Sequence, residues 1–254
     1  MSLASRAPRL RGLVAAGLLS TAVLTGCGGD DADAEPRADS DAKAAEASEK
    51  EEAEVDLASG LLPADAFGPD AVVAAVSPEE LEQGAGLAAS LGDVQVTPEA
   101  CGAAVQGTQP DLADFDDIAA VSAQEGTRAV VEMLVRGGPT EGTVDQLAGA
   151  AERCPEAQIS SPEIGQATVL FEDLPVADLG DGAAAVRYTT VVALPDGSQL
   201  SVPALLGAVE DGDRLVVLTS LAVDPTGAEV PPLDADAFVA LLEQAYETQA
   251  AALD

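Results

Sequence analysis

Asp-Gly dipeptides divide the second half of this sequence into runs of alternating apolar residues. The runs occupy about 164–171, 183–194, 199–209 and 214–223, and they are separated by Asp181-Gly182, Asp196-Gly197 and Asp211-Gly212. Asp-Gly readily adopts the backbone angles of a tight hairpin turn, and alternation with a period of two is typical of a strand with one buried face. The four runs therefore predict a four-stranded antiparallel meander.

A second strand pattern lies earlier in the chain, at 117–136. Its two halves meet at Gly126, which predicts a β-hairpin. Capping residues, prolines and acidic first turns predict helices that begin near residues 78, 98, 143 and 235. The predicted fold class is α+β: an antiparallel sheet of about six strands, made of a hairpin plus the four-stranded meander, packed with helices in a single domain over 57–254.

The N-terminus has the features of an export signal. Three arginines precede a short apolar run at 13–23, which is too short to span a bilayer. The run ends in Leu24-Thr25-Gly26-Cys27, which resembles the lipobox of bacterial lipoproteins. This resemblance implies cleavage between Gly26 and Cys27 and attachment of a diacylglyceryl group, with acyl chains such as palmitate, to the Cys27 thiol. The alternative is an ordinary signal peptide followed by a chance cysteine.

The export signal divides the chain into three predicted parts. Residues 1–26 form the signal peptide, 27–56 the lipidated cysteine and a linker, and 57–254 the domain. The linker is acidic and lacks apolar periodicity, so we expect it to be a disordered spacer. The predicted location is the extracytoplasmic face of the cell membrane, where the lipid on Cys27 is the anchor.

The charge of the chain restricts its partners. The whole chain carries a net charge of −34, and residues 57–254 hold 33 acidic residues and five arginines, a net charge of −28. Such a surface repels nucleic acid and anionic headgroups, so we expect no nucleic-acid partner. Solubility or salty surroundings explain the acidity, and a cationic partner is the alternative interpretation.

Two cysteines remain once Cys27 is assigned to lipid. Cys101 and Cys154 form an even pair in an exported domain, which predicts a disulfide between them. A reactive thiol pair and a metal site are the alternatives. The chain has no histidine and no Cys-x-x-Cys, and both absences favour the disulfide.

Several of these segments together resemble one known family, the extracellular sensor domain of PknH-type mycobacterial Ser/Thr kinases, which free-standing actinobacterial lipoproteins also carry. The resemblance covers roughly residues 61–251. It includes Leu61-Leu62-Pro63, Pro98-Glu99-Ala100-Cys101, the helix to Cys154, Leu179-Gly180-Asp181-Gly182 and Val186-Arg187-Tyr188. It implies a sensor domain that binds an unidentified ligand in a cleft, and it transfers no ligand residues to this chain.

The sequence contains few candidates for catalysis. The absence of histidine excludes Ser-His-Asp and Cys-His systems, and no Gly-rich phosphate loop occurs. We therefore predict no catalytic residues, no enzyme activity and no cofactor. The cluster Asp111, Asp114, Asp116 and Asp117 could offer oxygens to Ca²⁺, but a solvated acidic loop is the preferred interpretation, and no metal site is predicted.

The favoured function is that of a membrane-anchored, non-catalytic binding or sensor module for a small ligand or a cell-envelope partner. An anionic ligand would have to use one of the five arginines of the domain, and Arg187 is the predicted ligand-binding residue because it lies in the middle of a meander strand. One alternative is a carrier of an apolar or lipid ligand in an internal cavity. A carboxylate-based hydrolase is the third hypothesis.

Overall fold

The computed structural model describes residues 55–89, 94–106, 112–161, 165–194, 197–222 and 232–253. The predicted signal peptide, Cys27 and nearly all of the predicted linker lie outside these residues. Within the described ranges, no helix is both long and apolar enough to cross a membrane.

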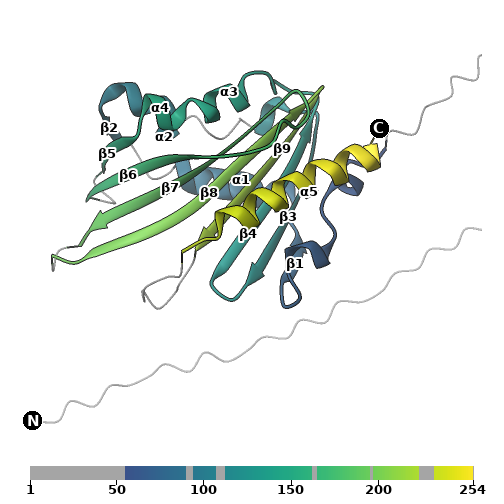
Figure 1. The fold of residues 1–254 in the computed structure, drawn as a ribbon, viewed down its shortest axis with the longest axis horizontal. Helices are drawn as coiled ribbons and strands as arrows, with labels where there is room; N and C mark the ends of the chain where they lie inside the picture. The colour runs from purple at the N-terminus through teal and green to yellow at the C-terminus, as the bar shows by residue number, and fades with distance from the viewer. Residues whose placement is uncertain are drawn as a thin grey trace, which may run out of the picture. The chain divides into compact units, whose positions relative to one another are not determined.

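One antiparallel sheet of nine strands forms the centre of the domain (Figure 1). Its spatial order is β1-β3-β4-β9-β8-β7-β6-β5-β2, and every neighbouring pair is antiparallel. The strands are β1 Val72–Ala75, β2 Gln95–Thr97, β3 Asp117–Glu125, β4 Arg128–Arg136, β5 Glu156–Ser161, β6 Gly165–Leu174, β7 Gly182–Ala193, β8 Gln199–Asp211 and β9 Arg214–Ala222.

The α+β class and the antiparallel sheet are confirmed, whereas the expected number of strands was wrong. The predicted hairpin is β3–β4 and the predicted meander is β6–β9, and the pairing of β4 with β9 joins them into one sheet. The three additional strands are β1, β2 and β5. They were missed because β1 and β2 have only four and three residues, and β5 reads Glu-Ala-Gln-Ile-Ser-Ser with little apolar alternation.

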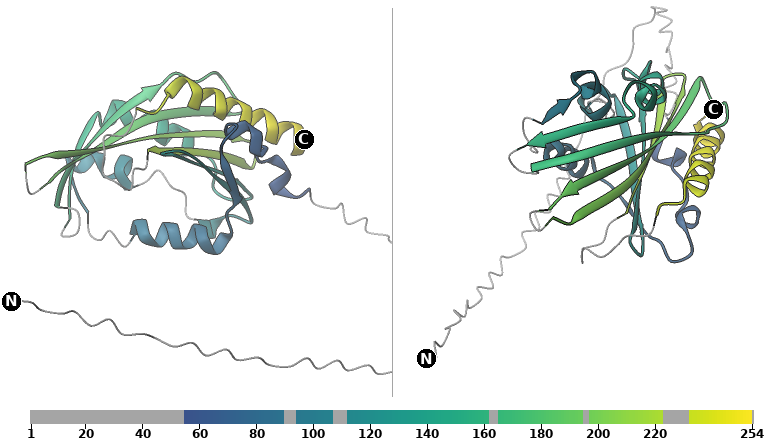
Figure 2. Two further views of the ribbon diagram at one scale, coloured as in Figure 1. Left: turned by 90° about the horizontal axis from the view of Figure 1, so that it is seen from below. Right: turned by 60° about the vertical axis from the view of Figure 1, so that its left-hand side comes forward.

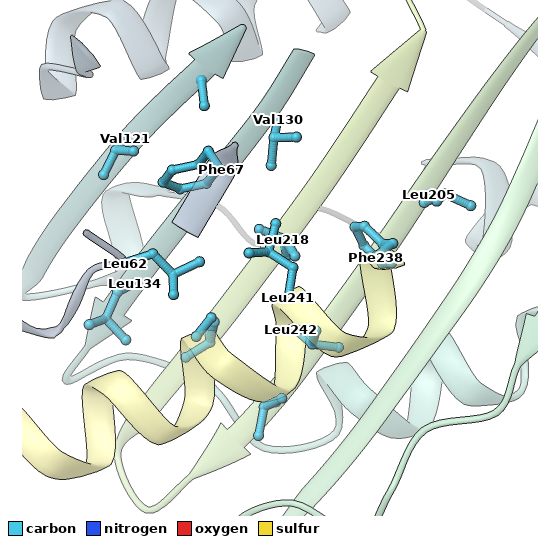
Figure 3. Packing of buried hydrophobic residues seen from close by; sticks show 14 of the residues in the cluster. Leu62, Phe67, Val121, Val130, Leu134, Leu205, Leu218, Phe238, Leu241 and Leu242 are labelled. Carbon is cyan, nitrogen blue, oxygen red and sulfur yellow. The ribbon is translucent and has the colours of Figure 1, made fainter. Parts of the chain in front are cut away.

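The terminal helix α5, Ala235–Leu253, covers one face of the sheet. Its Phe238, Leu241, Leu242 and Ala245 are buried against β4, β8 and β9 (Figure 3). Two short 3₁₀ helices precede the sheet: η1, Leu57–Gly60, packs beside α5, and η2, Ala64–Phe67, packs beside β3. Leu57, Leu62 and Phe67 of this segment are buried in the same cluster. This cluster is the larger core, and it excludes water from the middle of that face.

Two further helices pack on the opposite face. The first, α3, spans Thr143–Ala148, and its Val144 and Leu147 are buried against alternate positions of β7 and β8. The second, α4, spans Ala150–Arg153 and begins after Gly149. The helix that was predicted to begin near residue 143 and to run to Cys154 is therefore interrupted, and no side chain of the N-cap residue, Gly142, caps its first turn. Glu210 of β8 accepts a hydrogen bond from the Val144 amide at 2.9 Å instead. Figure 2 (left) shows α5 and α1, Pro78–Ala89, on opposite sides of the sheet.

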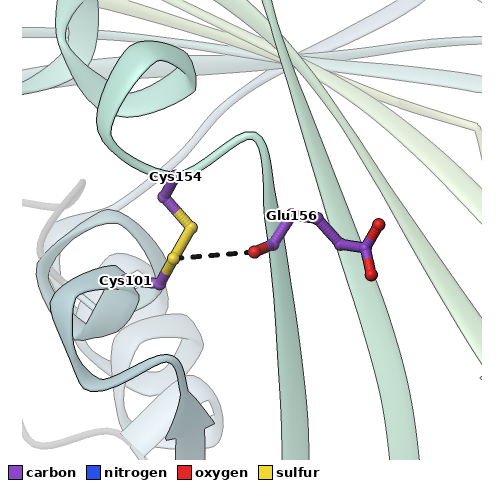
Figure 4. The surroundings of a disulfide bond; sticks show 3 residues. All are labelled: Cys101, Cys154 and Glu156. Atoms are coloured by element: carbon purple, nitrogen blue, oxygen red, sulfur yellow. Dashed lines mark hydrogen bonds between the residues drawn. A yellow bond between two sulfur atoms is a disulfide. The ribbon is translucent and has the colours of Figure 1, made fainter.

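The predicted disulfide links Cys101 and Cys154 across 53 residues, with a Cα–Cα distance of 5.3 Å (Figure 4). Cys101 closes the 3₁₀ helix η3, Glu99–Cys101, which continues into α2, Gly102–Gln106. Another short 3₁₀ helix, η4, spans Leu112–Asp114. Both sulfurs are buried with Ala150 and Ala157 in a small separate core, so the bond fastens η3 and α2 to the β5 end of the sheet.

Candidate functional site

The described cations of the domain are held by neighbouring groups. Four arginines form ion pairs with carboxylates: Arg128–Glu125 at 3.1 Å, Arg136–Asp117 at 2.9 Å, Arg187–Glu172 at 2.7 Å and Arg214–Asp211 at 2.8 Å. Arg153 donates a hydrogen bond to the Gln146 carbonyl oxygen at 2.7 Å. For Arg128 and Arg187 these contacts engage only part of the guanidinium, which carries five N–H donors.

Two open cavities flank α5, and each contains one of these arginines. We call the first the β6–β7 cavity; it has a volume of about 360 Å³ and is lined by Glu172, Leu174, Pro175, Arg187, Ala235, Asp236, Val239, Ala240 and Glu243. We call the second the β4–β9 cavity; it has a volume of about 280 Å³ and is lined by Glu125, Thr127, Arg128, Val130, Ser220, Ala222, Pro232, Leu233, Asp234, Phe238 and Leu241.

The β6–β7 cavity brings the sequence-predicted Arg187 to the surface beside α5. Arg187 pairs in register with Glu172 of β6, so the two side chains project from the same face of the sheet. Asp236 and Glu243 are seven residues apart on α5, about two helical turns, and both line the cavity. The rim therefore has one guanidinium and three carboxylates around a small apolar wall, which suits a ligand that presents a positive group.

The β4–β9 cavity was not anticipated from the sequence. Arg128 is held there by two contacts of its Nη2 atom, which donates to the Phe67 carbonyl oxygen at 2.7 Å and to Glu125. Gly68 has a φ of +124°, and a Cβ atom there would lie 2.5 Å from Glu125 Oε1. Sequence reasoning missed this cavity because its residues come from β3, β4, β9 and α5, which are far apart in the chain.

A buried carboxyl group lies in the core of the same sheet face, next to the segment that joins η1 and η2. Glu132 of β4 is 1% exposed, and its oxygens accept the Leu62 amide hydrogen at 3.0 and 3.3 Å. Burial in this apolar core raises the pKa of Glu132 from 4.5 to about 7, and the hydrogen bond from Leu62 offsets only part of that rise. The strand pattern at 117–136 placed Glu132 in a predicted strand, but it did not indicate that the Glu132 side chain faces the core.

The remaining sequence candidates occupy other places. Cys27 and Asp111 lie outside the described residues. Asp117 is held by Arg136, and Asp116 closely approaches Gly137. Among the residues that the structure describes, no group of three or more His, Cys, Asp or Glu side chains is arranged to hold a metal ion.

Comparisons with known proteins identify the fold. No protein-family model matches the chain. No curated protein matches it either. A solved structure of an uncharacterized protein from Mycobacterium smegmatis, the Rv0999 ortholog, matches with a TM-score of 0.50 and 15% identity, covering 77% of this chain and 97% of that chain. The extracellular domain of PknH from Mycobacterium tuberculosis matches with a TM-score of 0.40 and 12% identity, covering 74% and 93%.

The resemblance expected from the sequence is thus found among solved structures. The match to the Mycobacterium smegmatis protein shows a shared fold. The extracellular domain of PknH, which the sequence was predicted to resemble, is also among the matches. At this level of identity the likeness concerns the fold alone, so the function of the chain has to be inferred from its own cavities and side chains.

Proposed function

We propose that this chain is a lipid-anchored lipoprotein of the extracytoplasmic membrane face whose domain binds a small ligand without catalysis. The observation that carries the proposal is the β6–β7 cavity, a shallow site with Arg187 at its rim. In this proposal Cys27 bears the lipid, residues 28–56 are the spacer, and α5 and the sheet form the binding surface.

The character of the two cavities supports a binding module over a lipid carrier. A carrier needs an enclosed aliphatic chamber large enough for acyl chains, and ligand pockets usually measure 300–1,000 Å³. Both cavities beside α5 are open and mix charged with apolar residues, and their volumes, about 280 and 360 Å³, lie just below and just above the lower end of that range. Between α5 and the sheet, the described space is filled by Phe238, Leu241 and Leu242 (Figure 3).

The rim charges indicate the kind of ligand. A simple anion would have to displace Glu172 from Arg187 and would face Asp236 and Glu243. A small zwitterion avoids this conflict because its ammonium group can approach the carboxylates while its acceptor oxygen approaches the free N–H groups of Arg187. We therefore propose a zwitterionic small molecule as the ligand of the β6–β7 cavity.

Native mass spectrometry of the full chain, purified from its own host, tests the binding role. We expect a bound small molecule with wild type, and we expect Arg187→Gln to lose most of it. Arg153→Gln is the matched control, since it removes the same charge at an exposed position outside both cavities. A co-purified long-chain lipid would instead favour the carrier, and equal retention by Arg187→Gln would contradict the role of Arg187.

The anchor is tested separately. We expect Cys27→Ala to move the chain from the membrane fraction to the soluble fraction and to abolish its labelling by radioactive palmitate, because the acylated thiol is then missing. A variant that stays in the membrane fraction would contradict the lipoprotein proposal without affecting the ligand proposal.

A further inference from the structure

We propose that the β4–β9 cavity is a second binding site, and that it takes a small neutral molecule with an apolar body and one carbonyl oxygen. The site is separate from the β6–β7 cavity: the two share α5 as a wall but no lining residue. The inference depends on a buried hydroxyl group, on the unused donors of an arginine and on the charge balance of the cavity.

Ser220 supplies the buried hydroxyl group. It is 3% exposed on β9, and it lines the cavity. In the described part of the chain the Ser220 hydroxyl has no hydrogen-bond partner. It is not among the polar atoms that are both unpartnered and fully enclosed, since in the described residues Gln249 Oε1 is the one such atom. The Ser220 oxygen therefore keeps contact with the cavity space, and a buried hydroxyl without a partner is costly unless water or a ligand bonds to it.

Arg128 supplies further donors at the same cavity. Its Nη2 atom is engaged by Phe67 and Glu125, which hold the side chain between η2 and the β3–β4 hairpin. Its Nη1 and Nε atoms have no hydrogen-bond partner among the described residues. A guanidinium that is held in place and still has free N–H groups is a good donor for a carbonyl oxygen.

The rest of the cavity selects a neutral, apolar ligand body. Val130, Leu233, Phe238 and Leu241 form much of its wall, and Figure 3 shows Phe238 and Leu241 pointing from α5 toward the sheet. The lining contains one basic residue, Arg128, and two acidic residues, Glu125 and Asp234, so its net charge is −1. An anion would be repelled by this excess and by the acidic domain, whereas a neutral carbonyl compound accepts from Ser220 and Arg128 without that cost.

The test uses three probes of similar size with isotope-labelled full chain and NMR titration. Acetophenone is neutral and has a carbonyl oxygen, ethylbenzene lacks the oxygen, and benzoate is an anion. We expect acetophenone to shift the amide resonances of Thr127, Ser220 and Leu241 and to bind at least about fivefold more tightly than ethylbenzene, since each hydrogen bond to the carbonyl oxygen contributes about that factor. Benzoate should bind more weakly than acetophenone.

The substitution Ser220→Ala removes the hydroxyl group with little change in volume. We expect it to weaken acetophenone binding by about fivefold, the contribution of the Ser220 hydrogen bond, and to leave ethylbenzene binding unchanged, while Ser122→Ala on β3 changes neither. The proposal is overturned if the Ser220→Ala variant binds acetophenone like wild type, if benzoate binds best, or if none of the probes shifts these resonances. Shifts confined to Leu174, Arg187 and Val239 would place binding in the β6–β7 cavity and also overturn it.

Discussion

Replacing Glu132 by glutamine should make the domain more stable above neutral pH. Glu132 is paired across the sheet with Val121 of β3 and Leu218 of β9, both buried. Among the described residues, its carboxylate accepts a hydrogen bond from the Leu62 amide. The carboxylate has to be ionised inside this apolar core when the pH is high. Glutamine has almost the same shape and keeps an oxygen that can accept from Leu62, but it cannot ionise.

The size of the effect follows from the pKa of Glu132, which rises from 4.5 to about 7 on folding. At about 1.36 kcal/mol per pH unit, this difference corresponds to roughly 3 kcal/mol of unfolding free energy. Because the folded-state pKa is the higher one, the contribution is fully present below pH 4.5 and is lost as the pH rises through 7. Roughly 2 kcal/mol or more should therefore be lost between pH 5 and pH 8 in wild type, and not in Glu132→Gln.

Urea unfolding followed by circular dichroism at several pH values measures this difference. The decisive quantity is the change in unfolding free energy between pH 5 and pH 8, compared between wild type and Glu132→Gln. Glu247→Gln, at an exposed position of α5, is the control for the loss of one negative charge. Parallel pH curves for wild type and Glu132→Gln, or a Glu132 carboxyl that titrates near 4.5 by NMR, would refute the reasoning.

Two further predictions concern stability. Replacing Cys101 and Cys154 together by serine should lower the unfolding free energy by about 4 kcal/mol, because a cross-link over 53 residues restricts the unfolded chain; a loss below 1 kcal/mol under non-reducing denaturation would contradict this. Gly207→Ala should lower the unfolding free energy by about 1–3 kcal/mol, because the new Cβ would lie 2.7 Å from Leu242 Cδ2. Gly84→Ala should leave the unfolding free energy unchanged or raise it slightly, because there is open space around Gly84. Thermal unfolding of the two glycine variants compares them directly, and equal melting temperatures would contradict the predicted clash.

The sequence patterns predicted those elements whose signals are local. The alternating runs predicted β6 to β9, and the hairpin turn at Gly126, with a φ of +59°, joins β3 and β4 as expected. Pro203 pairs with β7, and the pairing of β8 with β9 begins only at the next residue, which agrees with a proline at the edge of a ladder. Strands β1, β2 and β5 were not predicted because they are short or polar and depend on their partners.

The cavities required information that no local pattern contains. Alternation could place Arg187 in the middle of a strand, but the position of Asp236 and Glu243 beside it depends on how α5 crosses the sheet. Likewise, Ser220 is an ordinary member of an alternating strand until α5 and the β3–β4 hairpin surround it. Its burial and its unpartnered hydroxyl are properties of that packing.

The α+β class, the meander, the disulfide and a helix that begins near residue 235 were all predicted from the sequence. The buried residues of that helix, Phe238, Leu241, Leu242 and Ala245, follow the helical period. These features depend on periodicity, turn residues and the number of cysteines. The folded structure was needed to establish the nine-stranded order, the burial of Glu132 and the two cavities, because these features depend on which distant segments meet. Side-chain environment is set by the partners that packing brings together, and the residue order alone does not specify them.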